Sequence, residues 1–422
     1  MDELHYSKPP AAIASRVSKP ELMAPAGNKT MLFAVINSGA DAVYLGVEKL
    51  NMRAKASNFK SADLPEMILY CKEKGVKTYL TLNTIIYENE LDQLRTIIAE
   101  AKDAGVDRII CWDFSVVQLC KEIGMPFCIS TQGSVSNSLA AKFYKDLGAE
   151  RIVLARECSL EDIKRIRALT NLEIEVFVHG AMCIALSGRC FMSHYLFDKS
   201  ANKGECIQPC RREYEVYDPI INKGMVIGED YVLSPQDLCT IEFIDKLIET
   251  GVDSFKIEGR KRSPEYAAAA TTAYRKAIDL YFEGELTPDV KKELITELEK
   301  VFNRGFSSGF YIKTPGINEY ADSYGSIASK RKEYLGKVIN YYKKAGIAYI
   351  SIESGTLNTG DEIYIIGDTT GVIKLKVENI MNEEDELTSA SKGDRVTFRC
   401  NDLVRARDAV YLIKNQEETR TL

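Results

Sequence analysis

The chain has 422 residues and a formal charge of −6, which arises from 55 basic and 61 acidic side chains. With 45% hydrophobic and 27% charged residues, it has the composition of a globular protein, which excludes a disordered or fibrous chain. No apolar run approaches the ~18 residues of a membrane span, and no signal peptide is recognisable. We therefore expect a cytoplasmic protein without a membrane partner. The mild acidity argues against indiscriminate nucleic-acid binding but permits one local basic surface.

Residues 1–20 read as a polar leader, and from residue 21 a short apolar strand followed by a helix recurs along the chain. The strands lack strict alternation, which is typical of strands buried on both faces of a parallel sheet. Eight of them, closed by a helix at 264–282, predict a (β/α)8 TIM-type barrel over residues 21–302. A doubly wound open sheet is the alternative, but the first strand is not followed by a Gly-rich phosphate loop. The predicted strands are Glu21–Ala26, Asp41–Gly46, Lys77–Asn83, Asp107–Trp112, Phe127–Thr131, Arg151–Arg156, Leu172–His179 and Asp253–Glu258.

Two further segments depart from this pattern. A cysteine-rich insertion at 181–234 separates the seventh strand from the eighth. After residue 302, a stretch rich in Gly, Ser and aromatic residues predicts a linker over 303–333. From residue 334 to residue 422, alternating apolar runs separated by turn residues predict a small C-terminal antiparallel β-barrel domain. Its predicted strands are Tyr349–Glu353, Asp361–Ile366, Ile373–Val377, Asp394–Arg399 and Asp408–Ile413.

Eleven cysteines are expected to stay reduced in the cytoplasm. Four of them, Cys183, Cys190, Cys206 and Cys210, fall in the insertion. Four thiolates brought together by a loop-rich segment predict a sulfur site for zinc or an iron–sulfur cluster. Their spacing lacks the C-x2-C pairs that structural zinc favours, so it leans toward the cluster. We interpret the other seven cysteines as core residues.

Polar residues follow the predicted barrel strands, at the end of the barrel where active sites of this fold are built. In the last strand, alternation places Lys256, Glu258 and Arg260 on one face. Together with Lys261 and Arg262 they predict a basic mouth for an anionic small molecule or a phosphate backbone. The other candidates at the strand ends are Asn83, Asp113, Gln132, Arg156, Glu157, Glu175 and His179. For Glu175 and Asp113, a structural ion pair is the alternative interpretation.

A nucleophile with a neighbouring base is poorly supported. The chain has three histidines, His5, His179 and His194, and it lacks both a G-x-S-x-G elbow and an H-E-x-x-H helix. A hydrolytic set assembled from Ser187 or Ser193 with His179 or His194 is the weaker hypothesis.

The run Glu175-Val-Phe-Val-His179-Gly-Ala-Met-Cys183, followed by Ser187-Gly-Arg-Cys190, resembles the signature of the collagenase-like peptidases, peptidase family U32. The resemblance covers nearly the whole chain and includes segments 21–28, 41–46, 51–53, 234–238, 256–261 and 303–306. Within the family the chain most resembles the branch that hydroxylates wobble uridine of tRNA to 5-hydroxyuridine in a prephenate-dependent way. Related members act on a ribosomal RNA cytidine or in ubiquinone synthesis. The C-terminal domain also resembles the second-domain barrels of translation GTPases, over 357–364 and 393–396.

The resemblance implies that the four cysteines of the insertion hold a [4Fe-4S] cluster, with prephenate as co-substrate and tRNA as partner; a paralogous partner subunit is left open. The other roles are assigned from the positions of the residues at the ends of the predicted barrel strands, and not from the resemblance. We expect Arg156, Lys256 and Arg260 to hold the prephenate carboxylates, and phosphate contacts from Arg211, Arg212, Lys261 and Arg262. The predicted catalytic residues are Glu175, His179, Asp113 and Glu258, and the predicted substrate-binding residues are Arg53, Asn83, Gln132, Arg156, Lys256, Arg260, Lys261 and Arg211.

The main hypothesis is therefore an enzyme, a tRNA uridine 5-hydroxylase. Two alternatives remain open at this stage. One is a peptidase that acts on collagen-like chains, for which a nucleophile and base or an open catalytic metal would be required. The other is a non-enzymatic RNA-binding or assembly factor in which the four cysteines hold structural zinc.

Overall fold

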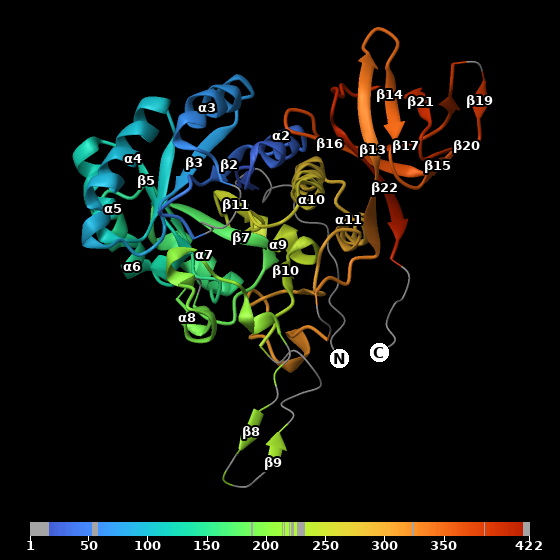
Figure 1. Ribbon diagram of the computed structural model, residues 1–422. Coiled ribbons are helices and arrows are strands. Elements are labelled where there is room, and N and C mark those ends of the chain that lie inside the picture. Colours follow the sequence, from blue (N-terminus) through green and yellow to red (C-terminus); the bar gives the residue numbers. More distant parts are fainter. Residues whose placement is uncertain are drawn as a thin grey trace.

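Eight parallel strands close into a barrel in the computed structural model (Figure 1), which describes residues 17–52, 58–186, 189–212, 214, 216–218, 220, 223–225, 233–322, 325–383 and 385–416. The last barrel strand, β11, pairs in parallel with both β1 and β7, so the sheet has no open edge at this seam. The predicted (β/α)8 barrel is confirmed, and the open-sheet alternative is wrong. The barrel strands are β1 (Glu21–Ala26), β2 (Ala42–Leu45), β3 (Lys77–Thr81), β4 (Arg108–Cys111), β5 (Phe127–Ile129), β6 (Arg151–Val153), β7 (Glu173–Ala181) and β11 (Ser254–Ile257).

Amphipathic helices cover the outside of the barrel. In α4 (Leu91–Ala104) the buried residues are Leu94, Ile97, Ile98 and Ala101, the i, i+3, i+4 spacing that turns one helical face to the sheet. The helix ends at Gly105, whose φ of 81° is a left-handed conformation that glycine adopts without strain. The other helices are α2 (Lys29–Asn37), α3 (Leu64–Glu73), α5 (Phe114–Ile123), α6 (Ser138–Asp146), α7 (Leu160–Leu169), α9 (Ile244–Ile248), α10 (Pro264–Glu283) and α11 (Pro288–Glu299). Among the described residues, none of the helices is both long and apolar enough to cross a membrane.

The insertion leaves the barrel where β7 ends. β7 continues to Ala181 and pairs antiparallel with β10 (Asp237–Cys239), which in turn pairs with β12 (Phe306–Ser307). Gly180, at a φ of 106°, lies at this exit, and a Cβ atom there would stand 2.6 Å from the backbone oxygen of Glu258. Between β7 and β10 lie α8 (Met192–Phe197) and the hairpin of β8 (Val216–Asp218) and β9 (Lys223–Met225), which projects away from the barrel in Figure 1. The short 3-10 turns of the chain are Ser61–Asp63, Glu88–Glu90, Thr131–Gly133, Ala201–Lys203, Pro209–Arg211, Ile241–Phe243 and Ile317–Glu319.

An antiparallel domain with its own apolar core follows the barrel, as the sequence predicts. Its first strand begins at Lys330, inside the segment predicted to be a linker, because the charged start of this strand carries no apolar alternation. The strands are β13 (Lys330–Tyr342), β14 (Ile347–Ile352), β15 (Thr356–Asn358), β16 (Glu362–Gly367), β17 (Gly371–Lys376), β18 (Ile380–Met381), β19 (Glu386–Leu387), β20 (Ser389–Ser391), β21 (Arg395–Arg399) and β22 (Ala409–Asn415).

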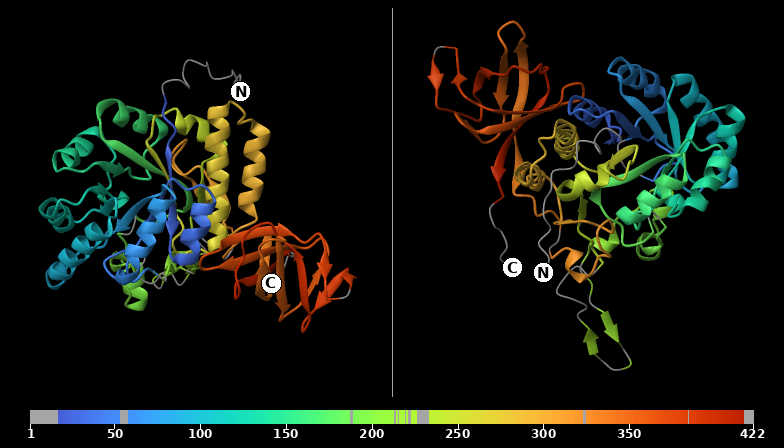
Figure 2. Two further views of the ribbon diagram at one scale, coloured as in Figure 1. Left: turned by 90° about the horizontal axis from the view of Figure 1, so that it is seen from above. Right: turned by 180° about the vertical axis from the view of Figure 1, so that it is seen from behind.

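The C-terminal domain packs against α2 and the adjacent end of the α10 and α11 pair (Figure 2). Gly371, at a φ of 74°, lies so close to α2 that a Cβ atom there would stand 2.7 Å from the backbone nitrogen of Ala34. The hydroxyl of Thr30 donates to Asp368 over 2.7 Å, and the amide of Asn37 donates to a backbone oxygen of the same turn. The contact therefore combines close backbone packing with side-chain hydrogen bonds.

A buried ion network fills the barrel at the starts of its strands. Glu175 of β7 has no exposed surface, and its carboxylate accepts from Lys256 at 2.7 Å and from Arg151 at 3.0 Å. Arg151 also donates to Glu21 at 2.6 Å and to Glu173 at 2.8 Å. Burial alone would raise the pKa of Glu175, but Lys256 and Arg151 more than offset this and hold that pKa below its usual range. The network joins β1, β6, β7 and β11 through charges that compensate one another.

Replacing Glu175 with Gln tests this network. The variant leaves Arg151 and Lys256 buried with less negative charge beside them, so we expect a loss of about 3–5 kcal/mol in the free energy of unfolding. Chemical denaturation measures it. The matched control is Glu161→Gln, which removes one partner of an exposed ion pair with Arg165 and should cost less than ~0.5 kcal/mol. Equal losses in the two variants would contradict a structural role for Glu175.

Candidate functional site

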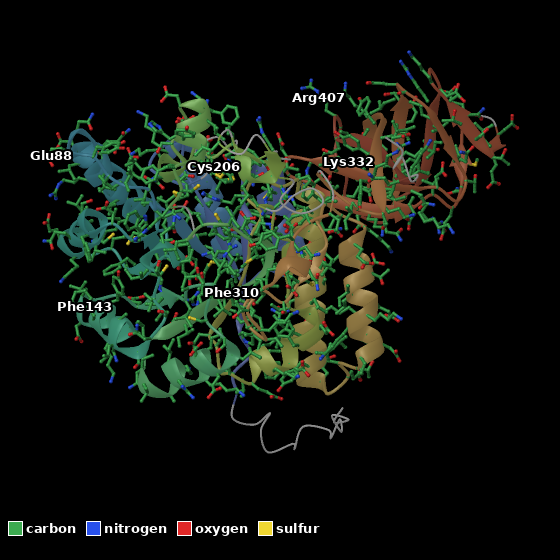
Figure 3. All side chains as sticks on the ribbon, turned by 90° about the horizontal axis from the view of Figure 1, so that it is seen from below. Glu88, Phe143, Cys206, Phe310, Lys332 and Arg407 are labelled. Carbon is green, nitrogen blue, oxygen red and sulfur yellow. The ribbon has the colours of Figure 1, made fainter. Side chains whose placement is uncertain are left out.

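A cavity of about 160 Å³ opens at the carboxyl ends of the barrel strands, the end at which the sequence predicts the site. Its floor and walls come from the barrel, and the insertion covers one side. Tyr44 and Phe177 supply aromatic surface, and Thr81 and Ser130 supply hydroxyl groups. Cys206, one of the insertion residues at the cavity, is labelled in Figure 3. The cavity thus joins residues of β2, β3, β4, β6, β7 and β11, and of the loops that follow the strands, to residues from the loop-rich insertion.

Most of the predicted site residues meet at this cavity, but three do not. Those that line it are Asn83, Gln132, Arg156, Lys256, Glu258, Arg260, Lys261, Arg211, Cys183, Cys190, Cys206 and Cys210. Glu175 lies beneath it in the ion network, and His179 is buried behind it. Asp113 caps α5 by accepting from the backbone of Ser115 and is not among the lining residues. Arg53 lies outside the described residues.

Arg156 presents an incompletely bonded guanidinium at the cavity wall. One of its terminal nitrogens donates to the backbone oxygen of Ala181 over 2.6 Å, and its guanidinium carbon lies 4.1 Å from the ring centre of Phe177. Its Nε atom is buried and has no hydrogen-bond partner among the described residues. A buried donor without a partner costs free energy, which an anionic ligand in the cavity would recover.

Arg260 is fixed in place from two sides. Its guanidinium donates to the Thr81 hydroxyl at 2.8 Å and to the Asn51 side chain at 3.0 Å. Gly46 makes room for it, because a Cβ atom there would stand 2.3 Å from the guanidinium nitrogen. A Cβ atom at Gly27 would likewise stand 2.2 Å from the backbone oxygen of Arg260, so glycine makes room for this oxygen. Both glycines belong to segments on which the family resemblance rests, and close approach explains their identity.

The four cysteines of the insertion share the cavity, and the sulfurs of two of them accept hydrogen bonds. The Cys206 sulfur accepts from the backbone nitrogen of Gln208 at 3.4 Å and from the Ser193 hydroxyl at 3.8 Å. The Cys190 sulfur accepts from the backbone nitrogen of Met192 at 3.4 Å. Such donors stabilise negative charge on sulfur, which is the state in which a cysteine binds metal. The remaining seven cysteines are buried, as predicted.

The four thiols are close enough to affect one another electrostatically. Burial raises the pKa of Cys210 to about 11; Arg211 opposes the rise, and the other three thiols add to it. Within the described ranges, no three cysteine, histidine or acidic side chains converge as one metal ion requires. Four cysteines at one cavity supply the sulfur donors that both a zinc ion and an iron–sulfur cluster take.

Three arginines share one carboxylate behind the cysteines. Asp237 is 1% exposed and lies 3.1 Å from Arg304 and 3.9 Å from Arg262. Burial lowers the pKa of Arg304 to about 10; Asp237 opposes this, and Arg211 and Arg262 contribute to it. Arg211, predicted as a phosphate contact, is buried and donates to the backbone oxygens of residues 182 and 235. These hydrogen bonds link the segment that follows β7 to the segment that precedes β10.

His179 is enclosed by aromatic rings and does not line the cavity. The ring centres of Tyr266 and Tyr274 lie 5.8 and 5.5 Å from the imidazole. Burial lowers the pKa of His179 to about 3, and Arg262 lowers it further while Glu258 opposes it. The imidazole is therefore neutral near pH 7. Its place in the family motif follows from its packing in the β7–β10 ladder, where it is the partner of Cys239.

A phenylalanine in place of His179 should make stability less dependent on pH. The folded state holds this imidazole neutral, whereas the unfolded state takes up a proton below pH ~6.5. Wild-type stability should therefore fall between pH 7.5 and 5, and His179→Phe should flatten that fall. Unfolding at the two pH values measures the difference. His194→Phe, at a side chain 60% exposed, is the control and should behave as wild type; a parallel fall in His179→Phe would refute the assignment.

Several cavity residues were not predicted from the sequence, because only charged, amide and imidazole side chains were selected at the strand ends. Tyr44 lies on β2, donates to the Ile257 backbone oxygen over 2.9 Å, and has the Lys256 ammonium 4.6 Å from its ring centre. Thr81 and Ser130 also went unpredicted. A signal existed for Tyr44 and Thr81, since both lie near the carboxyl ends of predicted strands.

The closed barrel, with cations and cysteines around one cavity at the carboxyl ends of its strands, has the architecture of a barrel enzyme. The model for peptidase family U32 matches residues 27–320. The chain belongs to this family, as the sequence resemblance predicts.

Relatives with different names cover between 69% and 94% of the chain. It is 41% identical over 410 residues to "Collagenase" of Porphyromonas gingivalis, covering 94% of this chain and 99% of the relative. It is 36% identical over 380 residues to "tRNA hydroxylation protein P1" of Bacillus subtilis, covering 88% and 89%. Over 300 residues it is 36% identical to the "23S rRNA 5-hydroxycytidine C2501 synthase" of Escherichia coli, covering 69% and 45%. The chain is an enzyme, and its relatives carry both peptidase and RNA-hydroxylation names.

Proposed function

We propose that this enzyme hydroxylates the wobble uridine of tRNA to 5-hydroxyuridine, with prephenate as co-substrate and a [4Fe-4S] cluster as cofactor. The observation that carries the proposal is the composition of one cavity, which four cysteines line together with Arg156, Lys256 and Arg260. The relatives named for tRNA hydroxylation and for 5-hydroxycytidine synthesis support an RNA substrate.

Cys183, Cys190, Cys206 and Cys210 would hold the cluster, which would supply electron transfer when bound. The backbone donors to the sulfurs of Cys190 and Cys206 favour the thiolate form of these ligands. Lys261 supports the same loop from outside by donating to the backbone oxygen of Cys206 over 2.9 Å. Protons leave the thiols when metal binds, so loading weakens as pH falls.

Prephenate is a dicarboxylate, and guanidinium groups bind carboxylates through paired hydrogen bonds. Arg156 is the residue best suited to hold one carboxylate, because its buried Nε has no partner among the described residues. Arg260 and Lys256 add positive charge to the same cavity. The target uridine would have to leave its stack to reach the cavity, where Tyr44 and Phe177 offer ring surfaces.

Peptidase activity is the second candidate, favoured by the identity with collagenase-named relatives. Hydrolysis by a serine requires a base within hydrogen-bond reach. The Ser193 hydroxyl points to the Cys206 sulfur, and His179 is buried away from the cavity. No histidine is among the described residues that line the cavity, so the second candidate has weaker support from the geometry.

The test is mass spectrometry of tRNA nucleosides from a deletion strain that expresses each variant. We expect wild type to restore 5-hydroxyuridine, and Arg156→Gln and Cys206→Ser to reduce it at least ~10-fold, because each removes a ligand-binding group. Arg156→Lys keeps the charge but loses the fork and should be intermediate. Unchanged 5-hydroxyuridine in the deletion strain, with no redundant paralogue, would sink the proposal.

Metal analysis of anaerobically purified protein separates the cofactors. Iron and sulfide with a brown colour support the cluster, whereas stoichiometric zinc in a colourless protein contradicts it. Cys400→Ser is the matched control, because Cys400 belongs to the core of the C-terminal domain and its thiol donates a hydrogen bond to the backbone oxygen of Asp402. It should keep iron and activity. If Cys206→Ser unfolds the protein, the result favours the alternative in which the cysteines hold structural zinc. If the variant keeps the circular dichroism spectrum of wild type but no longer modifies tRNA, the result favours a role of the site in catalysis. Hydrolysis of gelatin by wild type would favour the peptidase.

A further inference from the structure

A second hollow of about 260 Å³ opens beside the cysteine-lined cavity. Met52 and Gln132 line both spaces, so the two are direct neighbours. The second hollow also receives residues from the loop after β3, from the end of β4 and from the insertion. Its lining consists of Met52, Ile85, Trp112, Gln132, Arg189, Phe191 and Asn202. We call this space the aromatic hollow.

The walls of the aromatic hollow are suited to a flat ring. Trp112 is the one tryptophan of the sequence, and its indole nitrogen donates to the Asn83 backbone oxygen over 2.9 Å, which fixes the ring. The guanidinium of Arg189 lies 4.7 Å from the indole ring centre and donates to the Gln132 backbone oxygen over 2.8 Å. A held indole, an arginine and Phe191 are the side chains on which unpaired bases stack.

Exposed aromatic residues continue from the hollow along α8. Phe191 is 73% exposed and Tyr195, one turn later, is 87% exposed. The next ring, that of Phe197, has the Arg212 guanidinium 4.5 Å from its centre. These rings expose apolar surface to water, and a bound partner would bury that surface. The guanidinium groups of Arg189 and Arg212 among these rings make the surface complementary to a phosphate-linked chain of bases.

We propose that the aromatic hollow binds the base of an unpaired nucleotide next to the one that enters the cavity. The inference rests on the proposed function, because it takes the substrate to be RNA. Since Met52 and Gln132 wall both spaces, consecutive nucleotides of one strand can occupy them. The neighbouring base stacks between Trp112 and Phe191, and this contact holds the target nucleotide out of its own stack. Phe191 is thus a positioning residue.

Binding of a fluorescein-labelled anticodon stem-loop RNA to the full-length protein, purified anaerobically, tests the hollow. We expect Phe191→Ala to weaken binding about 10-fold, as loss of one base–aromatic stack does. Phe191→Tyr keeps a ring and should bind as wild type. The matched control is Phe143→Ala, at a phenylalanine 55% exposed on α6 and far from Cys206 in Figure 3, which should leave binding unchanged.

An RNA that lacks the base next to the target completes a double-mutant cycle. If that base stacks on Phe191, the abasic RNA should bind wild type about 10-fold more weakly, and Phe191→Ala should add little further loss. Additive losses would overturn the proposed contact, and so would equal binding by Phe191→Ala and wild type.

Two other outcomes separate this inference from the function on which it rests. Wild type that neither binds the stem-loop nor restores 5-hydroxyuridine would remove both proposals. Wild type that modifies tRNA, with Phe191→Ala equally active and equally tight, would remove the inference alone. If Phe191→Ala abolishes self-association in sedimentation but leaves RNA affinity unchanged, the surface is a contact between copies of the chain, and the proposal is wrong.

Discussion

The buried carboxylate of Glu175 is the constraint on which the rest of the structure depends. It meets Arg151 and Lys256 at the seam where β11, the last strand to enter the barrel, joins β7 and β1. Burying this ion pair costs desolvation free energy. Replacing one partner leaves the other charge buried and unpaired, so the loss of stability is much larger than the net stabilisation that the intact pair provides. Lys256 also lines the cavity above, and one side chain therefore links barrel closure to the chemistry of the site.

The sequence predicts the barrel and much of the site because both follow local rules. Buried parallel strands have a continuous apolar texture, and polar residues after them, such as Asn83, Gln132 and Arg156, must meet at one end. The depth of a side chain within the barrel is harder to predict from the sequence. Glu175 lies near the start of β7 and His179 in the β7–β10 ladder, and neither position is visible in the residue types. The aromatic hollow was not predicted at all, because chain segments distant in sequence form it.

Charge is distributed unevenly in this acidic protein. Arg211, Arg262 and Arg304 surround the single carboxylate of Asp237, which leaves local positive charge beneath the cysteines. Arg211 lowers the pKa of Cys210 against the effect of burial. Negative charge on the Cys210 sulfur is therefore better tolerated here than burial alone would allow. Arg211, which the sequence places among the phosphate contacts, interacts electrostatically with the thiols of Cys183 and Cys210.

The pairing of β7 with β10 has a consequence for how the family can diversify. Ala181 and Asp237 are partners in one short antiparallel ladder, so the insertion leaves and re-enters the sheet at the same place. Segments that begin and end together can change length or sequence at little cost to the scaffold. Residues 182–236 are accordingly an exchangeable module. Grafting the corresponding segment from another member onto this barrel would replace the four cysteines and the exposed rings of α8 as a single unit.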